Sequence, residues 1–74
     1  RKYYVVSAGR RTGVFDSWPY VQSLTSGVSG NCQKSYTTYE EAVSVYQHLK
    51  ANGLVRVIRN RGDESFFGSI EDAM

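Results

Sequence analysis

A short turn between two glycines constrains the fold of this chain more than any other segment. Ala8–Gly13 reads A-G-R-R-T-G, and two glycines this close together are typical of a tight turn, here with two arginines at its tip. The preceding run, Lys2–Ser7, is K-Y-Y-V-V-S, whose aromatic and β-branched residues favour a strand. Val14 and Phe15 return as a second strand. The sequence therefore predicts an N-terminal β-hairpin that must lean on other elements.

Two helices are expected after the hairpin. Ser17–Pro19 is typical of a helix start, because serine caps free N–H groups and proline is tolerated in the first turn. Gly27 is expected to end this helix. The second helix begins at a capping box, Thr38–Glu41, and stops at Asn52–Gly53. Its apolar residues fall on one stripe, which consists of Ala42, Val45, Tyr46 and Leu49.

The remaining segments complete a small α+β fold. Asn31–Tyr36 is expected to be a third, more polar strand, and Leu54–Ile58 a fourth strand or an extended segment that covers the core. Asn60–Glu64 is expected to be a charged turn. The predicted fold is a three-stranded antiparallel sheet packed by two helices, in the order ββαβα. Residues 1–53 form this domain, and residues 54–74 are a C-terminal extension packing on it.

The sequence contains no arrangement typical of catalysis or metal binding. His48 is the single histidine, and we expect it on a helix surface. The single Cys32 excludes an internal disulfide framework and a cysteine-based zinc cluster. Glu40 and Glu41 are adjacent on a helix, so their side chains diverge by about 100° and cannot share a proton. We therefore expect a binding module rather than an enzyme, with no catalytic residue, metal or cofactor.

Positive charge is concentrated in the first half of the chain. Residues 1–38 carry five cations and one carboxylate, and residues 39–74 carry four cations and six carboxylates, so the halves differ by +4 against −2. This asymmetry indicates an N-terminal basic face, with ordinary surface charge as the alternative. No apolar run approaches the roughly 20 residues that span a bilayer, and no membrane partner is expected. The chain begins at Arg1 without a methionine, so we expect it to be part of a longer protein. We expect that protein to be intracellular, nuclear or cytoplasmic.

One stretch of sequence resembles a known family. Tyr4–Trp18 reads Y-V-V-S-A-G-R-R-T-G-V-F-D-S-W, and Lys34–Tyr36 and Thr38–Ala42 follow as K-S-Y and T-Y-E-E-A. This pattern is similar to the N-terminal hybrid-binding domain of eukaryotic ribonuclease H1, also called the caulimovirus viroplasmin domain. The segment beyond it resembles an extension of fungal relatives. The resemblance implies a non-catalytic module that recognises RNA/DNA hybrid or double-stranded RNA by shape and tethers a larger protein.

The resemblance also implies the contacting residues. The Gly9–Gly13 loop corresponds to the part that approaches RNA 2′-hydroxyls, Trp18 packs on the DNA sugar-phosphate, and Lys34 binds phosphate. Gln33 and Ser35 stand where the family has an aromatic residue and a second lysine, so a platform and a charge are missing. The predicted nucleic-acid-binding residues are Tyr4, Gly9, Arg10, Arg11, Thr12, Gly13, Trp18, Lys34 and Ser35.

Each of these residues also has a structural alternative. Trp18 could be part of the core, Arg10 and Arg11 could be solubilising charges at a hairpin tip, and Lys34 could protect an edge strand. The hybrid-binding hypothesis predicts one continuous positive surface from the two arginines to Lys34, beside an exposed Trp18. The alternative function is a protein-interaction or self-association module, a homodimer, suggested by the apolar residues of the extension.

Overall fold

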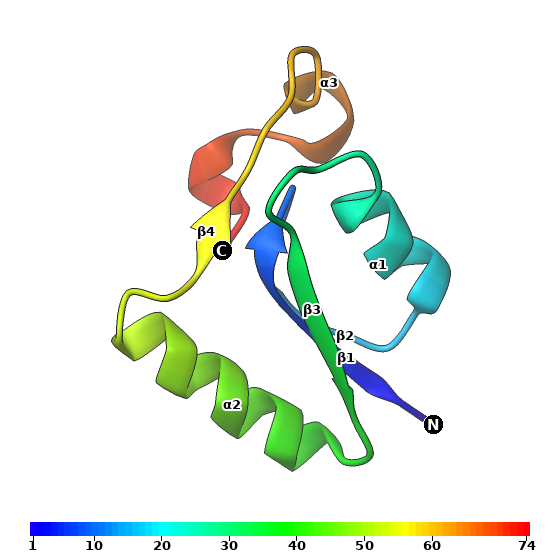
Figure 1. Ribbon diagram of the computed structural model, residues 1–74, viewed down its shortest axis with the longest axis vertical. Coiled ribbons are helices and arrows are strands. Elements are labelled where there is room, and N and C mark those ends of the chain that lie inside the picture. The colour runs from blue at the N-terminus through cyan, green and yellow to red at the C-terminus, as the bar shows by residue number, and fades with distance from the viewer.

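The order of strands and helices matches the ββαβα prediction. The computed structural model describes residues 1–74 and contains β1 (Tyr3–Gly9), β2 (Gly13–Phe15), α1 (Trp18–Thr25), β3 (Cys32–Tyr36), α2 (Tyr39–Ala51), β4 (Arg56–Val57), α3 (Glu64–Phe67) and a 3-10 turn, η1 (Ile70–Asp72). The predicted α+β class is therefore confirmed (Figure 1). None of the helices is long and apolar enough to cross a membrane.

Strand β1 is the centre of the sheet. It pairs antiparallel with β2, where Val5 lies opposite Val14, and antiparallel with β3, where Val5 lies opposite Lys34. The short β4 then pairs with the end of β1 in parallel, with Ala8 opposite Arg56. The sheet is therefore mixed and has a fourth strand. The predicted fourth strand forms, but it is shorter than the predicted apolar run.

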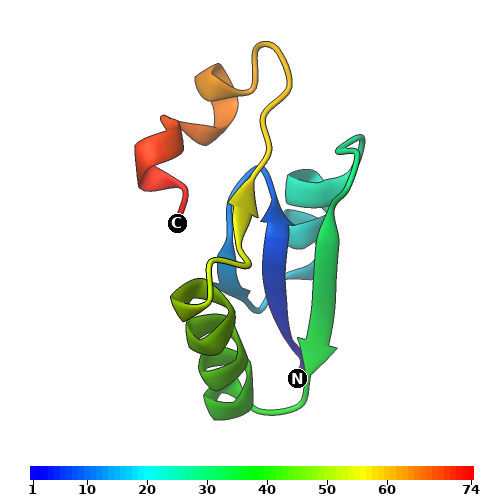
Figure 2. The same ribbon diagram turned by 60° about the vertical axis from the view of Figure 1, so that its left-hand side comes forward.

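The two long helices lie on opposite faces of the sheet (Figures 1 and 2). Successive side chains of a strand point to opposite faces. On one face Val6 packs with Val21 and Leu24 of α1, and all three are fully buried. On the other face Tyr3 contacts Tyr39 of α2, with ring centres 5.7 Å apart. A central strand covered on both faces explains why apolar residues are continuous along β1.

Both helix starts use the predicted N-cap hydroxyls. The Ser17 hydroxyl accepts the N–H of Tyr20, and the Thr38 hydroxyl accepts the N–H of Glu41 at 3.2 Å. These bonds satisfy N–H groups that have no partner inside the helix. After α2, Gly53 has a φ of +68°, a left-handed conformation that glycine adopts without strain. Local sequence signals therefore determine both helix starts.

The C-terminal segment packs beside the β1–β2 turn (Figure 2). Its penultimate residue, Ala73, is 2% exposed, and its carbonyl accepts the N–H of Thr12 at 2.8 Å. Phe67 packs against the buried cluster of the α1 face. Helix α3 was not predicted, because Asn60–Glu64 was expected to be a turn and the helix begins at its last residue. The segment is therefore an integral layer of the molecule.

Candidate nucleic-acid interface

The backbone of the β1–β2 turn is held by the rest of the molecule. The carbonyl of Gly9 accepts the N–H of Ile58 at 2.8 Å. Thr12 is 5% exposed, and its hydroxyl lies 2.8 Å from the Tyr46 hydroxyl on α2. A Cβ atom at Gly9 would lie 2.8 Å from the Leu24 carbonyl oxygen, which is too close. The turn therefore requires glycine at this position, and its backbone N–H and C=O groups are partly used inside the molecule.

Arg10 joins α1 to the C-terminal segment. Its Nε donates to an Asp63 carboxylate oxygen at 2.9 Å, and only 13% of each side chain is exposed. The same guanidinium donates to the carbonyls of Ser23 and Ser26 at the end of α1, at 2.9 and 2.7 Å. It also lies 5.5 Å from the ring centre of Phe67. This cation is therefore fully engaged within the protein.

The Asp63 carboxylate is the ionic partner of Arg10. Its carboxylate accepts the backbone N–H of Asn60 at 2.6 Å, and this bond is the main reason that its pKa lies below the ordinary value of 3.8. Desolvation is the next largest effect and raises the pKa, whereas the hydrogen bond and charge of Arg10 and the charge of Arg59 lower it. The carboxylate is therefore ionised throughout the neutral range and stays paired with Arg10.

Two more arginines in this region bind backbone carbonyls. Arg11 donates to the Tyr20 hydroxyl at 3.3 Å and to the Asp72 carbonyl at 3.2 Å. The Nε of Arg59 donates to the Arg10 carbonyl at 2.8 Å, and its other nitrogens reach carbonyls at the end of α3. The positive charges around the turn therefore have internal partners, and Arg11 is half-buried.

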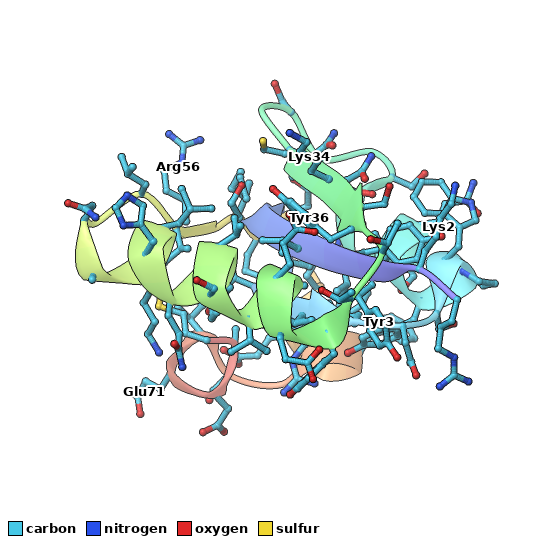
Figure 3. All side chains as sticks on the ribbon, turned by 90° about the horizontal axis from the view of Figure 1, so that it is seen from below. Lys2, Tyr3, Lys34, Tyr36, Arg56 and Glu71 are labelled. Carbon is cyan, nitrogen blue, oxygen red and sulfur yellow. The ribbon has the colours of Figure 1, made fainter.

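At the β3 edge, in contrast to the turn, the side chains are exposed and the basic residue has no internal ionic partner. β3 pairs only with β1, so its other edge is open, and Cys32–Ser35 are all exposed. The Lys34 ammonium lies 5.7 Å from the ring centre of Tyr36 and has no carboxylate partner. Tyr36 was not among the predicted site residues, although its position two residues after Lys34 places both on one face of the strand. Figure 3 shows the two side chains on this edge.

Trp18 lies on the α1 face of the sheet, beside Tyr4 of β1. Its ring centre is 5.5 Å from that of Tyr4, and the side chain is 43% exposed. Tyr4 lies opposite Ser35 in the β1–β3 register, so these three residues flank the α1 face of β3. Trp18 thus combines the two roles considered for it: one part packs on the sheet and the other meets solvent.

The structure does not bring all the predicted residues together. Lys34 is level with Val5, whereas Arg10 follows Gly9 at the far end of β1. Five residues of strand span about 16 Å, so the arginines and Lys34 lie well apart. Arg10, which is paired with Asp63, therefore does not join Lys34 in one positive surface. The physical reason is that Asp63 and several carbonyls of the C-terminal segment and of α1 engage the arginines.

The surface pocket of the molecule does not lie at the β1–β2 turn or at the open edge of β3. A shallow pocket of about 280 Å³ opens between β2 and α2, lined by Tyr3, Val14, Phe15, Asp16 and Tyr39. Its one carboxylate, Asp16, pairs with Arg1 at 3.5 Å on the surface. No group of three or more histidine, cysteine, aspartate or glutamate side chains is placed to hold a metal ion.

The ββαβα core with an open strand edge carrying aromatic and basic side chains defines a class of small α+β binding domains. Comparison with known families identifies which one. The family described as the ribonuclease H1 N-terminal domain matches residues 2–44, more than half of the chain, and the chain belongs to this family. It is a nucleic-acid-binding family, and its domain is the non-catalytic N-terminal part of the proteins that carry it.

Individual relatives agree with this assignment. The chain is 38% identical over 42 residues to a ribonuclease H of Schizosaccharomyces pombe, which is 57% of this chain and 16% of the relative. It is 42% identical over 40 residues to the transactivator/viroplasmin protein of Cauliflower mosaic virus, 54% of this chain and 8% of the relative. A ribonuclease H of Crithidia fasciculata is 33% identical over 64 residues, 85% of this chain and 13% of the relative.

These matches have two consequences. The chain spans between 8% and 16% of the length of these relatives, so it corresponds to a small part of each. The match to the Crithidia fasciculata protein covers 85% of a 74-residue chain and therefore extends past residue 53 into the C-terminal segment. No solved structure gives a significant match.

Proposed function

We propose that this domain binds RNA/DNA hybrid or double-stranded RNA by shape and tethers a larger protein to it. The observation that carries the proposal is the exposed Trp18, packed against Tyr4 of β1, next to the open edge strand β3 with an unpaired Lys34. A-form duplexes present a wide, shallow minor groove with 2′-hydroxyls and flanking phosphates, which suits a surface of this kind. The membership of the chain in a nucleic-acid-binding family supports the same function.

The two sides of the β3 edge supply different contacts. Lys34 offers a charge to a phosphate, with Tyr36 beside it. On the other side, Trp18 offers an apolar surface to a sugar, and Ser35 offers a hydroxyl. A sugar-phosphate strand that lies along β3 is therefore contacted from both faces of the sheet. Contacts of this type fix register and geometry without reading base sequence.

The β1–β2 turn has a divided role in this proposal. Gly9, Arg10 and Thr12 hold the shape of the turn through their internal contacts. Arg11 and Gly13 are half-buried rather than buried, and they are the members that can reach a 2′-hydroxyl. In this proposal the β1–β2 turn contributes the shape of the binding surface more than its positive charge.

Gln33 and Ser35 stand where the family has an aromatic residue and a second lysine, and this difference determines the affinity that we expect for nucleic acid. Each phosphate contact that is missing lowers the salt dependence of binding by about one unit of slope and weakens binding to all sequences alike. We therefore expect moderate affinity that falls as salt rises, less steeply than with both family contacts present, and no sequence preference.

A titration against RNA/DNA hybrid, double-stranded RNA and DNA duplex of equal length tests this function. We expect the hybrid or the double-stranded RNA to bind more tightly than the DNA duplex. Trp18→Ala and Lys34→Ala should weaken binding, whereas Lys50→Ala, which removes a charge at the end of α2, should have little effect. Absence of any complex with the hybrid at about 50 mM salt, where phosphate contacts are strong, would contradict the proposal.

Self-association is a second candidate, because the C-terminal segment exposes apolar side chains. Phe66 on α3 is 86% exposed, and Leu54, Ile70 and Met74 are each more than half exposed. Exposed apolar side chains on a small domain often mark a protein contact. Light scattering at high concentration tests this candidate: a dimer that Phe66→Ser dissociates supports it, and a monomer contradicts it.

A further inference from the structure

The lysine and arginine side chains that have no partner inside the molecule lie outside the β1–β2 turn, where the sequence motif has its two arginines. Of the nine lysine and arginine side chains, Arg1 pairs with Asp16, and three arginines around the β1–β2 turn have internal partners. The other five form neither an ion pair nor a hydrogen bond, and they are Lys2, Lys34, Lys50, Arg56 and Arg61. These five are the cations available to an anionic ligand.

Arg56 and Lys34 belong to neighbouring parts of the sheet. Arg56 on β4 lies opposite Ala8 of β1, and Ala8 lies opposite Cys32 of β3. Arg56 is therefore level with Cys32, and Lys34 is two residues further along β3, about 7 Å in the strand direction. Figure 3 shows both side chains extending on the same side of the molecule.

The side chain of Arg56 reaches toward the start of β3. A guanidinium nitrogen lies 3.4 Å from the position that a Cβ atom would occupy at Gly30, in the turn that leads into β3. Strands β3 and β4 pair with opposite edges of β1 at Ala8, so their backbones are about 10 Å apart, and the arginine extends across β1 toward β3.

We propose that Arg56 is a phosphate-binding residue that acts together with Lys34. The inference rests on the proposed function, and it adds a residue that lies outside the stretch matched by the family. Lys34 with the Tyr36 ring on β3, and Arg56 extending from β4 toward the start of β3, form a surface with two unpaired cations that tracks the backbone of one nucleic-acid strand. Arg56 thereby supplies a second positive charge near β3, where Ser35 stands in place of a second lysine, and the C-terminal extension takes part in ligand binding.

The test compares Arg56→Gln with Arg61→Gln. Both variants remove one exposed arginine from the extension, so net charge changes equally and only position differs. Binding of a fluorescent RNA/DNA hybrid is measured over a range of salt concentrations. We expect Arg56→Gln to reduce the slope of log K against log salt by about 0.9, which is about an eightfold loss of affinity at 0.1 M salt. Arg61→Gln should bind like the wild type.

The outcomes separate this inference from the function on which it rests. Trp18→Ala is measured in parallel, because its effect reports hybrid binding independently of Arg56. If Trp18→Ala weakens binding and Arg56→Gln does not, the role of Arg56 is refuted and hybrid binding stands. Equal losses in Arg56→Gln and Arg61→Gln also refute it, because they indicate a general charge effect. If the wild type binds an acidic peptide but no nucleic acid, both proposals fail.

Discussion

The two basic regions of this molecule use the same residue types for different purposes. At the β1–β2 turn, Arg10 is 13% exposed and bound to Asp63 and two helix carbonyls. At the β3 edge, Lys34 is exposed and has no carboxylate partner. The difference shows that the partner of a cation, rather than its place in a motif, decides whether it is available to a ligand.

The energetics of the turn explain why this division is stable. Removing a largely buried charge from its partner leaves the other charge uncompensated in a poorly solvated place. A phosphate that recruited Arg10 would therefore have to leave Asp63 unpaired. At the β3 edge, Lys34 has no carboxylate partner, so a phosphate can bind its ammonium without breaking an internal ion pair.

Removal of residues 54–74 is expected to have the largest effect. It deletes β4, the Ile58 bond to Gly9, the Ala73 bond to Thr12 and the partner of Arg10. A domain of this size has a total stability of about 5 kcal/mol, and loss of these contacts removes most of it. Urea unfolding followed by circular dichroism checks this. An unchanged midpoint for residues 1–53 would show that the segment does not hold the turn.

Arg10→Ala is expected to cause the second-largest loss of stability. Three hydrogen bonds of about 1 kcal/mol each are lost, so the free energy of unfolding should fall by about 3 kcal/mol. The matched variant Lys34→Ala, on the open edge, should change it by about 0.5 kcal/mol or less. Thermal unfolding of the two variants measures the contrast, and similar small changes in both would remove the distinction between the regions.

Trp18→Ala should act mainly on binding. An aromatic surface that buries about 50 Å² against a sugar contributes about 1.3 kcal/mol, so affinity for the hybrid should fall about tenfold. Trp18→Phe keeps an aromatic ring on Tyr4 and should recover part of the affinity. Fluorescence anisotropy measures both. Full affinity in Trp18→Ala would place the ligand away from the α1 side of the β3 edge.

The smallest effect concerns acid stability. The pKa of Asp63 is lowered in the folded state, so its contribution to stability is complete above about pH 3.8 and is lost as pH falls through the folded value. Asp63→Asn lacks this contribution at every pH. The difference in free energy of unfolding between wild type and Asp63→Asn should therefore shrink as pH falls below about 3.8. A constant difference between pH 7 and pH 2 contradicts this assignment.

The sequence predicted those parts of the fold that depend on nearby residues. Thr38 and Glu41 form the helix start within one turn of chain, and the glycines of the β1–β2 turn act locally, so both features were recognisable. Helix α3 escaped prediction because it is short and lies in a segment tied to the domain through Arg10 and Asp63, which are 53 positions apart. The same long-range pair reversed the expected role of Arg10. Lys34 followed its prediction of exposure because an edge strand leaves its side chains free.

The most direct test of the contrast is an NMR titration of the ¹⁵N-labelled domain with a short RNA/DNA hybrid. The account predicts that the largest shift changes occur at the amides of Cys32–Tyr36 and at the Trp18 indole. The amide of Thr12, which donates to the Ala73 carbonyl, should stay protected from hydrogen exchange throughout. The opposite result, with the largest changes at residues 10–12 and loss of protection at Thr12, would show that the C-terminal segment leaves the turn and that the turn binds the ligand.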